Sequence, residues 1–279
     1  MPPGDKHPAA DRCRVLLIGV SGCGKTGCLA SLANAGYNLR VIDLDDGLDP
    51  LISYTRPEFR KTINYVTLQD QVEVTGSEMR PKGGIADAYG ETISLLMNWV
   101  DGDVNLGPIS SWGPEDVLVI DSGTRLAEYM VNHQMMMNPG MTRWEAKGKA
   151  VDPMHGLLNN LASGHLKCNI IFIVHVQPLE DAVTGRMTLV PSVGGKILPP
   201  KVGSFFNSML TVADLGQGLQ LSKVLRTVSD GSMALKNPAP QVIPYELPLE
   251  LDADGYATGG MAEFFRLVKQ QAATGEIHA

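Results

Sequence analysis

The sequence lacks any apolar run long enough to cross a membrane. Its longest apolar stretches, such as residues 15–20 and 170–176, have the length of single β-strands. Residues 1–12 are polar and contain proline, and they include no apolar segment of the kind that a secretion signal requires. We therefore expect a cytoplasmic protein that has no membrane partner.

Cysteine is scarce, and positive charge is not in excess. The four cysteines, Cys13, Cys23, Cys28 and Cys168, suit a reducing compartment. Cys23 and Cys28 could be pictured as zinc ligands, but one lies in a glycine-rich loop and the other in the helix predicted after it, which favours ordinary packing. The net charge of −7 excludes a large basic surface that gathers nucleic acid indiscriminately, but it allows a local basic loop or a groove completed between subunits.

Strands and helices alternate through the first two-thirds of the chain. With 44% hydrophobic and 19% charged residues, the chain of 279 residues has the composition of an ordinary globular protein. The apolar pattern predicts strands at residues 14–18, 39–44, 63–68, 117–120 and 169–176. It predicts helices at residues 25–35, 85–100, about 125–137 and 153–165, the last with Asp152 as N-cap and Pro153 in the first position. This alternation indicates an α/β fold, a parallel sheet covered by helices on both faces.

The pattern changes after Gln177. Shorter strands are predicted at residues 186–190, 208–212, 220–227 and 241–245, with Gly, Pro and Asp between them and little helix. They indicate an antiparallel extension of the sheet in the C-terminal third, closed by a helix at about residues 261–272. The chain has no repeat or long linker, so we expect a flexible tail at residues 1–12 and a single domain at residues 13–279.

A phosphate-binding loop is the strongest motif in the sequence. Residues 19–26, Gly-Val-Ser-Gly-Cys-Gly-Lys-Thr, satisfy the pattern G-x-x-x-x-G-K-[ST] between a predicted strand and a predicted helix. Glycines let the backbone curl so that its N–H groups point at phosphate oxygens, and the following helix directs its positive end at the same charge. Lys25 is placed to reach the β- and γ-phosphates, and the Thr26 hydroxyl to bind Mg²⁺. The predicted cofactors are therefore ATP and Mg²⁺, and the predicted nucleotide-binding residues are Gly19, Val20, Ser21, Gly22, Cys23, Gly24, Lys25, Thr26 and Gly27.

A second acidic anchor follows the apolar strand at residues 117–120, which ends in Asp121. P-loop enzymes use an aspartate at such a strand end to hold the shell of Mg²⁺. Many strands end in Asp at a turn, so this interpretation depends on the phosphate-binding loop. Together the two motifs make Thr26 and Asp121 the candidate metal-binding residues.

Residues 41–50, Val-Ile-Asp-Leu-Asp-Asp-Gly-Leu-Asp-Pro, resemble the RecA recombinase family. In that family the strand after the first helix runs into the pattern I-D-x-E-x-x-L-D-P, whose glutamate activates the attacking water. The resemblance places this catalytic role on Asp45, which is one methylene shorter than glutamate. Either Asp45 acts through a longer water bridge, or Asp46 takes the role; a solvated acidic turn is the alternative without catalysis.

Two further strands follow in the order of the RecA family. Residues 117–122, which include the serine after the aspartate, resemble its metal-binding strand. Residues 171–175 resemble the core strand that ends in a polar γ-phosphate sensor, and this resemblance places the sensor on His175. An imidazole can donate a hydrogen bond to a phosphate oxygen. A packed core histidine is the alternative.

The resemblance continues more thinly beyond Gln177. Residues 180–192 and the following Gly194, Gly195 and Lys196 resemble the second mobile loop of RecA, which contacts single-stranded DNA. Lys236 resembles the lysine that a RecA-like subunit extends into its neighbour's nucleotide site, where it would stabilise charge in the transition state. Relatives carry a second cation two residues later, where this chain has Pro238, so an exposed hairpin lysine remains the alternative.

The resemblance covers about residues 14–244 and implies a RecA-like P-loop NTPase core. The chain has no recognisable polymerisation helix of the RecA type, and its compact length is similar to that of short RecA-like ATPases encoded by bacteriophages. Some of those proteins support single-strand annealing or recombination. The resemblance thus implies a host-cytoplasmic protein that binds single-stranded DNA and assembles into a ring or filament, with a single-strand binding protein as a further candidate partner.

Few residues are candidates for the DNA contacts themselves. Cations and one stackable ring occur together in a predicted loop, at Arg143, Trp144, Lys147 and Lys149, which is the composition of single-strand grooves. Lys196 and Lys201 could add phosphate contacts. The alternative is a solvated connecting loop with the tryptophan packed inward.

Several functions are compatible with these motifs. The favoured one is a Mg²⁺-dependent ATPase, stimulated by single-stranded DNA, in recombination or annealing. A hexameric motor of the helicase class shares the same core. An assembly or regulatory factor that uses ATP only to switch conformation belongs to a different class. A small-molecule kinase is disfavoured because the sequence has no arginine-rich lid segment.

Overall fold

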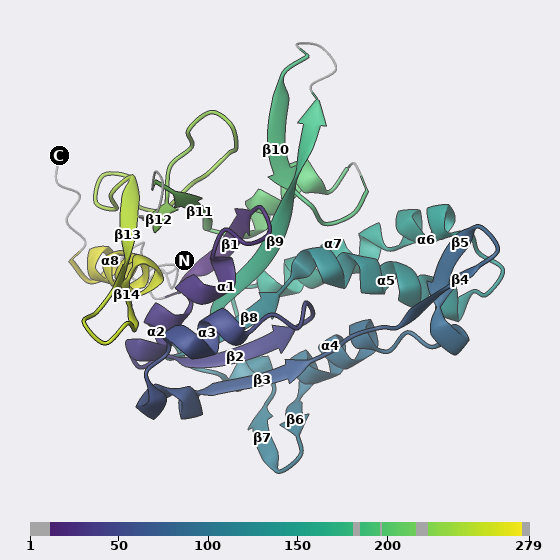
Figure 1. The fold of residues 1–279 in the computed structure, drawn as a ribbon, viewed down its shortest axis with the longest axis horizontal. Coiled ribbons are helices and arrows are strands. Elements are labelled where there is room, and N and C mark those ends of the chain that lie inside the picture. The colour runs from purple at the N-terminus through teal and green to yellow at the C-terminus, as the bar shows by residue number, and fades with distance from the viewer. Residues whose placement is uncertain (1–11, 181–184, 196, 216–222, 275–279) are drawn as a thin grey trace, which may run out of the picture.

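The computed structural model describes residues 12–180, 185–195, 197–215 and 223–274, so the predicted tail lies outside the described residues except for Arg12. A ten-stranded sheet forms its centre, in the order β14-β13-β12-β11-β1-β9-β8-β2-β3, with β10 paired to β9 (Figure 1). The parallel strands among the described residues are β1 Arg14–Gly19, β2 Asn38–Asp43, β3 Ile63–Thr67, β8 Asp116–Asp121, β9 Asn169–Glu180 and β11 Ser208–Asp214. The antiparallel strands are β10 Met187–Pro191, β12 Lys223–Arg226, β13 Glu246–Leu251 and β14 Ala257–Gly259. The predicted fold class, a mostly parallel sheet flanked by helices with antiparallel strands at its C-terminal end, is confirmed.

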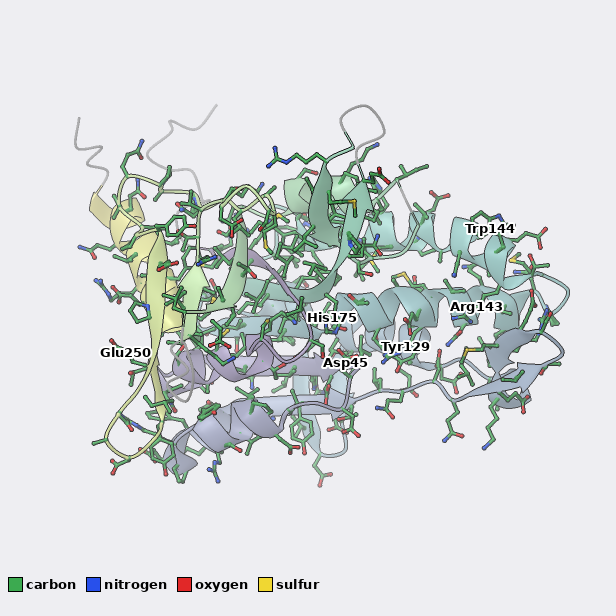
Figure 2. All side chains as sticks on the ribbon, turned by 45° about the horizontal axis from the view of Figure 1, so that its top comes forward. Asp45, Tyr129, Arg143, Trp144, His175 and Glu250 are labelled. Atoms are coloured by element: carbon green, nitrogen blue, oxygen red, sulfur yellow. The ribbon has the colours of Figure 1, made fainter. Side chains whose placement is uncertain are left out.

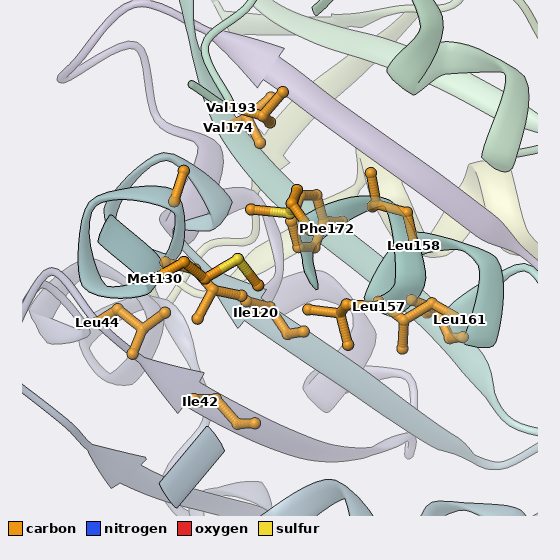
Figure 3. Close-up of a cluster of buried hydrophobic side chains, with 14 of the residues drawn as sticks. Ile42, Leu44, Ile120, Met130, Leu157, Leu158, Leu161, Phe172, Val174 and Val193 are labelled. Carbon is orange, nitrogen blue, oxygen red and sulfur yellow. The ribbon is translucent and has the colours of Figure 1, made fainter. Parts of the chain in front are cut away.

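Both faces of the sheet are buried, which explains the continuous apolar runs in its central strands. Successive residues of a strand point to opposite faces. In β1, Leu16 and Ile18 therefore join one apolar core, whereas Val15 and Leu17 join the other. Figure 3 shows part of the first core, where Phe172 of β9 lies near Met130.

Helices cover the two cores. On the first face lie α4 Ala88–Met97, α5 Gly123–Met137 and α7 Val151–Leu161. On the second face lie α1 Lys25–Cys28, α2 Ala30–Asn34, α3 Asp49–Tyr54 and α8 Gly260–Thr274. The single helix predicted at residues 25–35 is divided into α1 and α2 at Leu29. In the described part of the chain, no helix combines the length and apolar character needed to cross a membrane.

The predicted helix at residues 85–100 is wrong at both ends. α4 spans Ala88–Met97, and the chain then forms a hairpin from β6 Trp99–Asp101 and β7 Val104–Gly107. The buried Trp99 ring packs against Trp112, which ties this hairpin to the core. A second hairpin, β4 Val72–Thr75 with β5 Glu78–Pro81, was not expected either. Both hairpins lie outside the main sheet, and their strands of three or four residues are too short for an alternating pattern to be recognised.

The predicted loop around Arg143 is also wrong. Residues Arg143–Lys149 form helix α6, because Thr142 and Glu145 make a reciprocal capping box at its start. α7 then begins at Val151 directly after Ala150, so Asp152 lies in its first turn and is not the N-cap. Pro153 is therefore the third residue of the helix. Backbone N–H groups in the first turn have no partner within the helix, so a proline, which lacks this group, is accepted there.

The C-terminal third differs from the prediction in three respects. The strand at residues 208–212, grouped with the antiparallel extension, pairs parallel to β1 as β11. In the stretch at residues 180–192, the described residues belong mainly to a strand pair, because β9 continues to Glu180 and pairs with β10. Residues 181–184 lie outside the described residues. Residues 241–245 are not a strand, and the strand that pairs with β12 is β13, Glu246–Leu251.

Candidate active site

The carboxyl ends of the parallel strands bring the predicted site residues to one edge of the sheet. The register places Gly19 of β1 opposite His175 of β9, and Asp43 of β2 opposite Asp121 of β8. Strand β9 lies between β1 and β8. In open α/β sheets ligands bind at this edge, outside the carboxyl ends of the strands.

The loop that follows β1 is curled as the motif requires. Gly22 and Gly24 have φ angles of 78° and 106°, which residues with a side chain rarely adopt. A Cβ atom on Gly27 would lie 3.3 Å from Pro50, so the helix after the loop packs closely on the start of α3. Lys223 of β12 braces the loop from the other side, because its Nζ donates to the carbonyl of Cys23 at 2.9 Å.

Lys25 is the first residue of α1, and its side chain turns back across the loop. Its Nζ donates to the carbonyl oxygens of Gly19 at 3.1 Å and Val20 at 2.8 Å. The residue is only 6% exposed. The ammonium group is thus held inside the ring of backbone groups that the motif predicts as the phosphate cradle.

Thr26 and Asp121 meet, although they are far apart in the sequence. The Thr26 hydroxyl donates to Asp121 Oδ2 at 2.6 Å. Asp121 is 5% exposed, and burial raises its pKa to about 6. The hydrogen bond from Thr26 acts in the opposite direction, and the neighbouring carboxylates Asp45 and Asp43 add to the rise.

These two oxygens fit Mg²⁺. The ion prefers hard oxygen ligands, and it is usually bound through one or two protein oxygens, substrate phosphates and water. Within the described ranges no group of three His, Cys, Asp or Glu side chains could hold a metal by itself. A hydroxyl and a carboxylate beside a phosphate cradle therefore match an ion that arrives with a nucleotide, and Mg²⁺ would there neutralise phosphate charge.

The acidic turn after β2 is organised by Asp43. Its Oδ1 accepts from the backbone N–H groups of Asp45 at 3.2 Å and Gly47 at 3.4 Å. Burial raises the pKa of Asp43, and these hydrogen bonds oppose the rise. Asp46 has a φ of 56° and is exposed, whereas Asp45 faces the site. The turn thus directs Asp45 into the cavity and Asp46 to solvent, and these are the two residues between which the sequence left the water-activating role open.

The side chain of Asp45 contacts both His175 and Arg125. Figure 2 shows Asp45 and His175 close together. Its Oδ1 is 3.3 Å from Nε of Arg125, and its Oδ2 is 3.7 Å from Nε2 of His175. The backbone N–H of His175 donates to Thr124 Oγ1 at 2.9 Å. Arg125 was not among the site residues predicted from the sequence. It could have been recognised as a cation four residues after Asp121, in the first turn of the helix that follows.

A cavity of about 440 Å³ joins these residues. It contains the loop, the metal-binding pair and the Asp45 cluster, and its walls are Ser21, Gly22, Gly24, Lys25, Thr26, Gly27, Asp45, Gly47, Pro50, Asp121, Arg125 and His175. Neither Asp46 nor Lys236 lines it. A second cavity, of about 380 Å³, adjoins it at Gly24 and Pro50 and is mainly apolar, with Tyr54 and Leu249 in its wall.

The DNA candidates are only partly brought together. A hollow of about 240 Å³ is lined by Arg143 and Lys147 of α6 and by Gly194 and Gly195, so the two predicted segments share one surface. Arg143 also braces the fold, because its Nη1 donates to Asn132 Oδ1 at 3.1 Å. The remaining candidates are Lys149 and Lys201, which are exposed but do not line the hollow, and Lys196, which lies outside the described residues.

Trp144 does not pack inward. The residue is 80% exposed on α6, and Figure 2 shows it above Arg143 in that view. The inward packing weighed as an alternative is therefore wrong. An exposed tryptophan next to two cations provides a flat ring on which a base could stack.

Lys236 lies outside the cavity of its own chain. Its backbone pairs with Met209 of β11, and its side chain is exposed. Partial burial lowers its pKa. Lys236 is thus not among the residues that line the candidate nucleotide cavity of the same chain.

The sequence matches no protein-family model and no curated protein. Its structure is similar to that of a KaiC-like protein from Pyrococcus horikoshii OT3, with 11% identity, 88% of each chain covered and a TM-score of 0.41. It is also similar to the flagellar accessory protein FlaH from Methanocaldococcus jannaschii, with 9% identity, 90% of each chain covered and a TM-score of 0.42. A third similar structure is that of the RadB recombinase, with 16% identity, 76% of this chain and 80% of that chain covered, and a TM-score of 0.42.

Proposed function

We propose that this protein is a Mg²⁺-dependent ATPase that acts on single-stranded DNA in recombination or annealing of the bacteriophage type. The observation that carries the ATPase part is the 2.6 Å contact between Thr26 Oγ1 and Asp121 Oδ2 beside the buried Lys25. It joins the phosphate-binding loop to an acidic strand end two strands away in the sheet. That pairing is the arrangement by which P-loop enzymes hold Mg²⁺ on a triphosphate.

The two adjoining cavities fit the two ends of a nucleotide. The polar cavity contains Lys25 and the metal-binding pair, which suit the triphosphate. The apolar cavity begins at the same glycines and includes Tyr54, whose ring suits a stacked base. A triphosphate in the loop would offer Lys25 Nζ charged oxygens in place of the two carbonyls that it now contacts.

The catalytic assignment follows from the positions around the cavity. Asp45 would accept the proton of the attacking water, and His175 would contact the γ-phosphate. The water oxygen bonds to the γ-phosphorus as the bond to the bridging oxygen breaks, and ADP and phosphate leave. Asp46 is not part of this proposal because it does not line the cavity.

Single-stranded DNA would lie over the hollow between α6 and Gly194–Gly195. Arg143 and Lys147 supply two cations there beside the carboxylate of Glu128. The exposed Trp144 does not line the hollow and would supply a stacking surface on the same helix, α6. This local site is compatible with the overall charge of −7, because only one groove has to be basic. A ring or filament would add Lys236 of a neighbouring copy to the nucleotide site.

The test is ATP turnover measured with and without a single-stranded oligonucleotide at low salt. We expect hydrolysis that depends on Mg²⁺ and rises with the oligonucleotide, and Lys147→Gln should weaken oligonucleotide binding. Lys61→Gln is the matched control, since Lys61 is exposed and precedes β3 at the opposite edge of the sheet. ATP binding without DNA-stimulated hydrolysis or DNA retention would refute the DNA part.

Two alternatives give different outcomes in the same assays. ATP-driven unwinding of a duplex in one direction would favour a helicase-type motor on the same core. Stoichiometric ATP binding with negligible turnover, and recovery of a protein partner, would favour a conformational switch in assembly or regulation.

A further inference from the structure

Arg125 stands out among the cavity residues because none of the predicted roles uses it. It lies in the first turn of α5, close to the carboxyl end of β8. Its guanidinium is held at two points: Nε is 3.3 Å from Asp45 Oδ1, and Nη1 is 2.7 Å from Glu128 Oε2. The pairing with Glu128 holds the planar guanidinium of Arg125 in place, and the guanidinium in turn orients the carboxylate of Asp45.

Asp45 is a carboxylate that needs such a partner. It lines the same cavity as Asp121, and Arg125 is the arginine of that cavity. Two carboxylates in one cavity repel each other, and the guanidinium of Arg125 at 3.3 Å offsets the charge of Asp45. Arg125 occupies Oδ1 and leaves Oδ2 directed at His175, toward the predicted position of the γ-phosphate.

We infer that Arg125 is a positioning residue for ATP hydrolysis, which acts by holding Asp45 in the orientation that activates water. The inference rests on the proposed function. Glu128 supports Arg125 from the solvent side, one helical turn further along α5. Arg125 thus affects the rate of the chemical step through Asp45, and contributes little to nucleotide affinity.

The surroundings of Arg125 make the substitution a clean test. The side chains of Arg125 and Glu128 are 46% and 50% exposed. Exposed ion pairs contribute about 0–1 kcal/mol to stability, so variants at these positions should fold. A rate effect can therefore be separated from unfolding.

The experiment compares Arg125→Gln, Arg125→Lys and Asp45→Asn in the full chain, with kcat, KM and a direct Kd for ATP. A misplaced catalytic group can cost about 100-fold, so we expect Arg125→Gln to lower kcat about 10- to 100-fold. The Kd for ATP should change by less than about threefold. Arg125→Lys should recover part of the rate, because an ammonium can contact one oxygen but cannot form the two-sided fork.

A double-mutant cycle separates positioning from a merely structural role. If Arg125 acts through Asp45, the variant with both Arg125→Gln and Asp45→Asn should be no slower than Asp45→Asn alone. Arg266→Gln is the control and should leave kcat unchanged, because it removes an exposed arginine that pairs with a glutamate three residues away, Glu263, on α8.

Four results would overturn the inference. Multiplying rate losses in the double variant would show that Arg125 acts independently of Asp45. A Kd that rises in proportion to the loss of kcat would make Arg125 a phosphate ligand. If the wild type hydrolyses ATP and Arg125→Gln does so at the same rate, only the role of Arg125 is refuted. If the wild type does not hydrolyse ATP, the proposed function is refuted as well.

Discussion

Replacing Asp121 by asparagine should stabilise the nucleotide-free protein while it removes the metal site. Burial raises the pKa of Asp121 from 3.8 to about 6, so the folded state binds the proton more tightly than the unfolded state does. The ionised carboxylate is therefore a cost to folding at neutral pH. One pKa unit corresponds to about 1.4 kcal/mol, which makes this cost about 3 kcal/mol. Asparagine carries no charge and keeps an oxygen that can accept from Thr26.

The cost of the ionised Asp121 depends on pH. It is fully present above the folded pKa of about 6, falls as the pH drops, and is gone below 3.8, where the folded and the unfolded state both hold the proton. The free energy of unfolding of Asp121→Asn should therefore exceed that of the wild type by about 3 kcal/mol at pH 7.5, and the difference should shrink toward pH 4. For a chain of this length the gain corresponds to about 5 °C in Tm.

The assay is thermal and denaturant unfolding in the presence of a chelator, from pH 4 to pH 7.5. Asp103→Asn, at an exposed aspartate in the turn between β6 and β7, is the control and should change the free energy of unfolding little. Addition of Mg²⁺ and ATP should raise the Tm of the wild type but not that of Asp121→Asn. A less stable Asp121→Asn protein, or a difference that does not vary with pH, would refute the reasoning.

The geometry of the site also sets the expected effects of substitutions at Asp45, Lys236 and Gly123. Asp45→Asn should lower kcat about 100-fold or more and spare ATP binding, whereas Asp46→Asn should leave kcat within about twofold. If steady-state kinetics gave the opposite ranking, Asp46 and not Asp45 would be the proton acceptor. Lys236→Ala should lower turnover without weakening ATP binding by the isolated subunit. If the lysine acts on the nucleotide site of a neighbouring copy, a mixture of the Lys236→Ala and Asp45→Asn proteins should regain activity. A mixture that stays inactive would contradict this action between copies. Gly123→Ala should cost about 1–3 kcal/mol in denaturant unfolding, because its Cβ would lie 2.2 Å from a buried phenylalanine ring, whereas Gly156→Ala, with open space around it on α7, should be neutral or stabilising.

The phosphate-binding loop could be located from sequence because its chemistry is local. Residues 19–26 must be contiguous to curl around a phosphate, and the apolar strand before them is buried on both faces. The strand that ends in Asp121 was predictable for the same reason. The 2.6 Å contact between Thr26 and Asp121 required only that parallel strands end at one edge of the sheet.

The parts that escaped prediction depend on contacts between distant residues. Each strand of the β4–β5 hairpin has only four residues, and Val72 and Val74, the apolar residues of β4, are exposed, so no buried face marks this segment as part of a sheet. Helix α6 contains Gly148 and only one buried side chain, Ala146, and its capping box was overlooked. β11 could not be assigned as parallel from its own residues, because its partner β1 lies almost two hundred positions earlier.

The candidate site was incomplete for a related reason. Arg125 belongs to α5, whereas Asp45 belongs to the turn after β2, and the sequence alone does not show that these two segments meet. The choice between Asp45 and Asp46 depended on the local backbone, since the left-handed conformation of Asp46 directs the two side chains apart. Both points required the three-dimensional arrangement of the sheet edge.

Whether residues 19–26 bind a nucleotide can be measured by calorimetric titration of ATP with Mg²⁺ into the wild type, Lys25→Ala and Lys61→Ala. We expect one nucleotide per chain for the wild type and for Lys61→Ala, and no measurable binding for Lys25→Ala. Unchanged affinity after loss of Lys25, or wild-type affinity that is indifferent to Mg²⁺, would contradict this expectation.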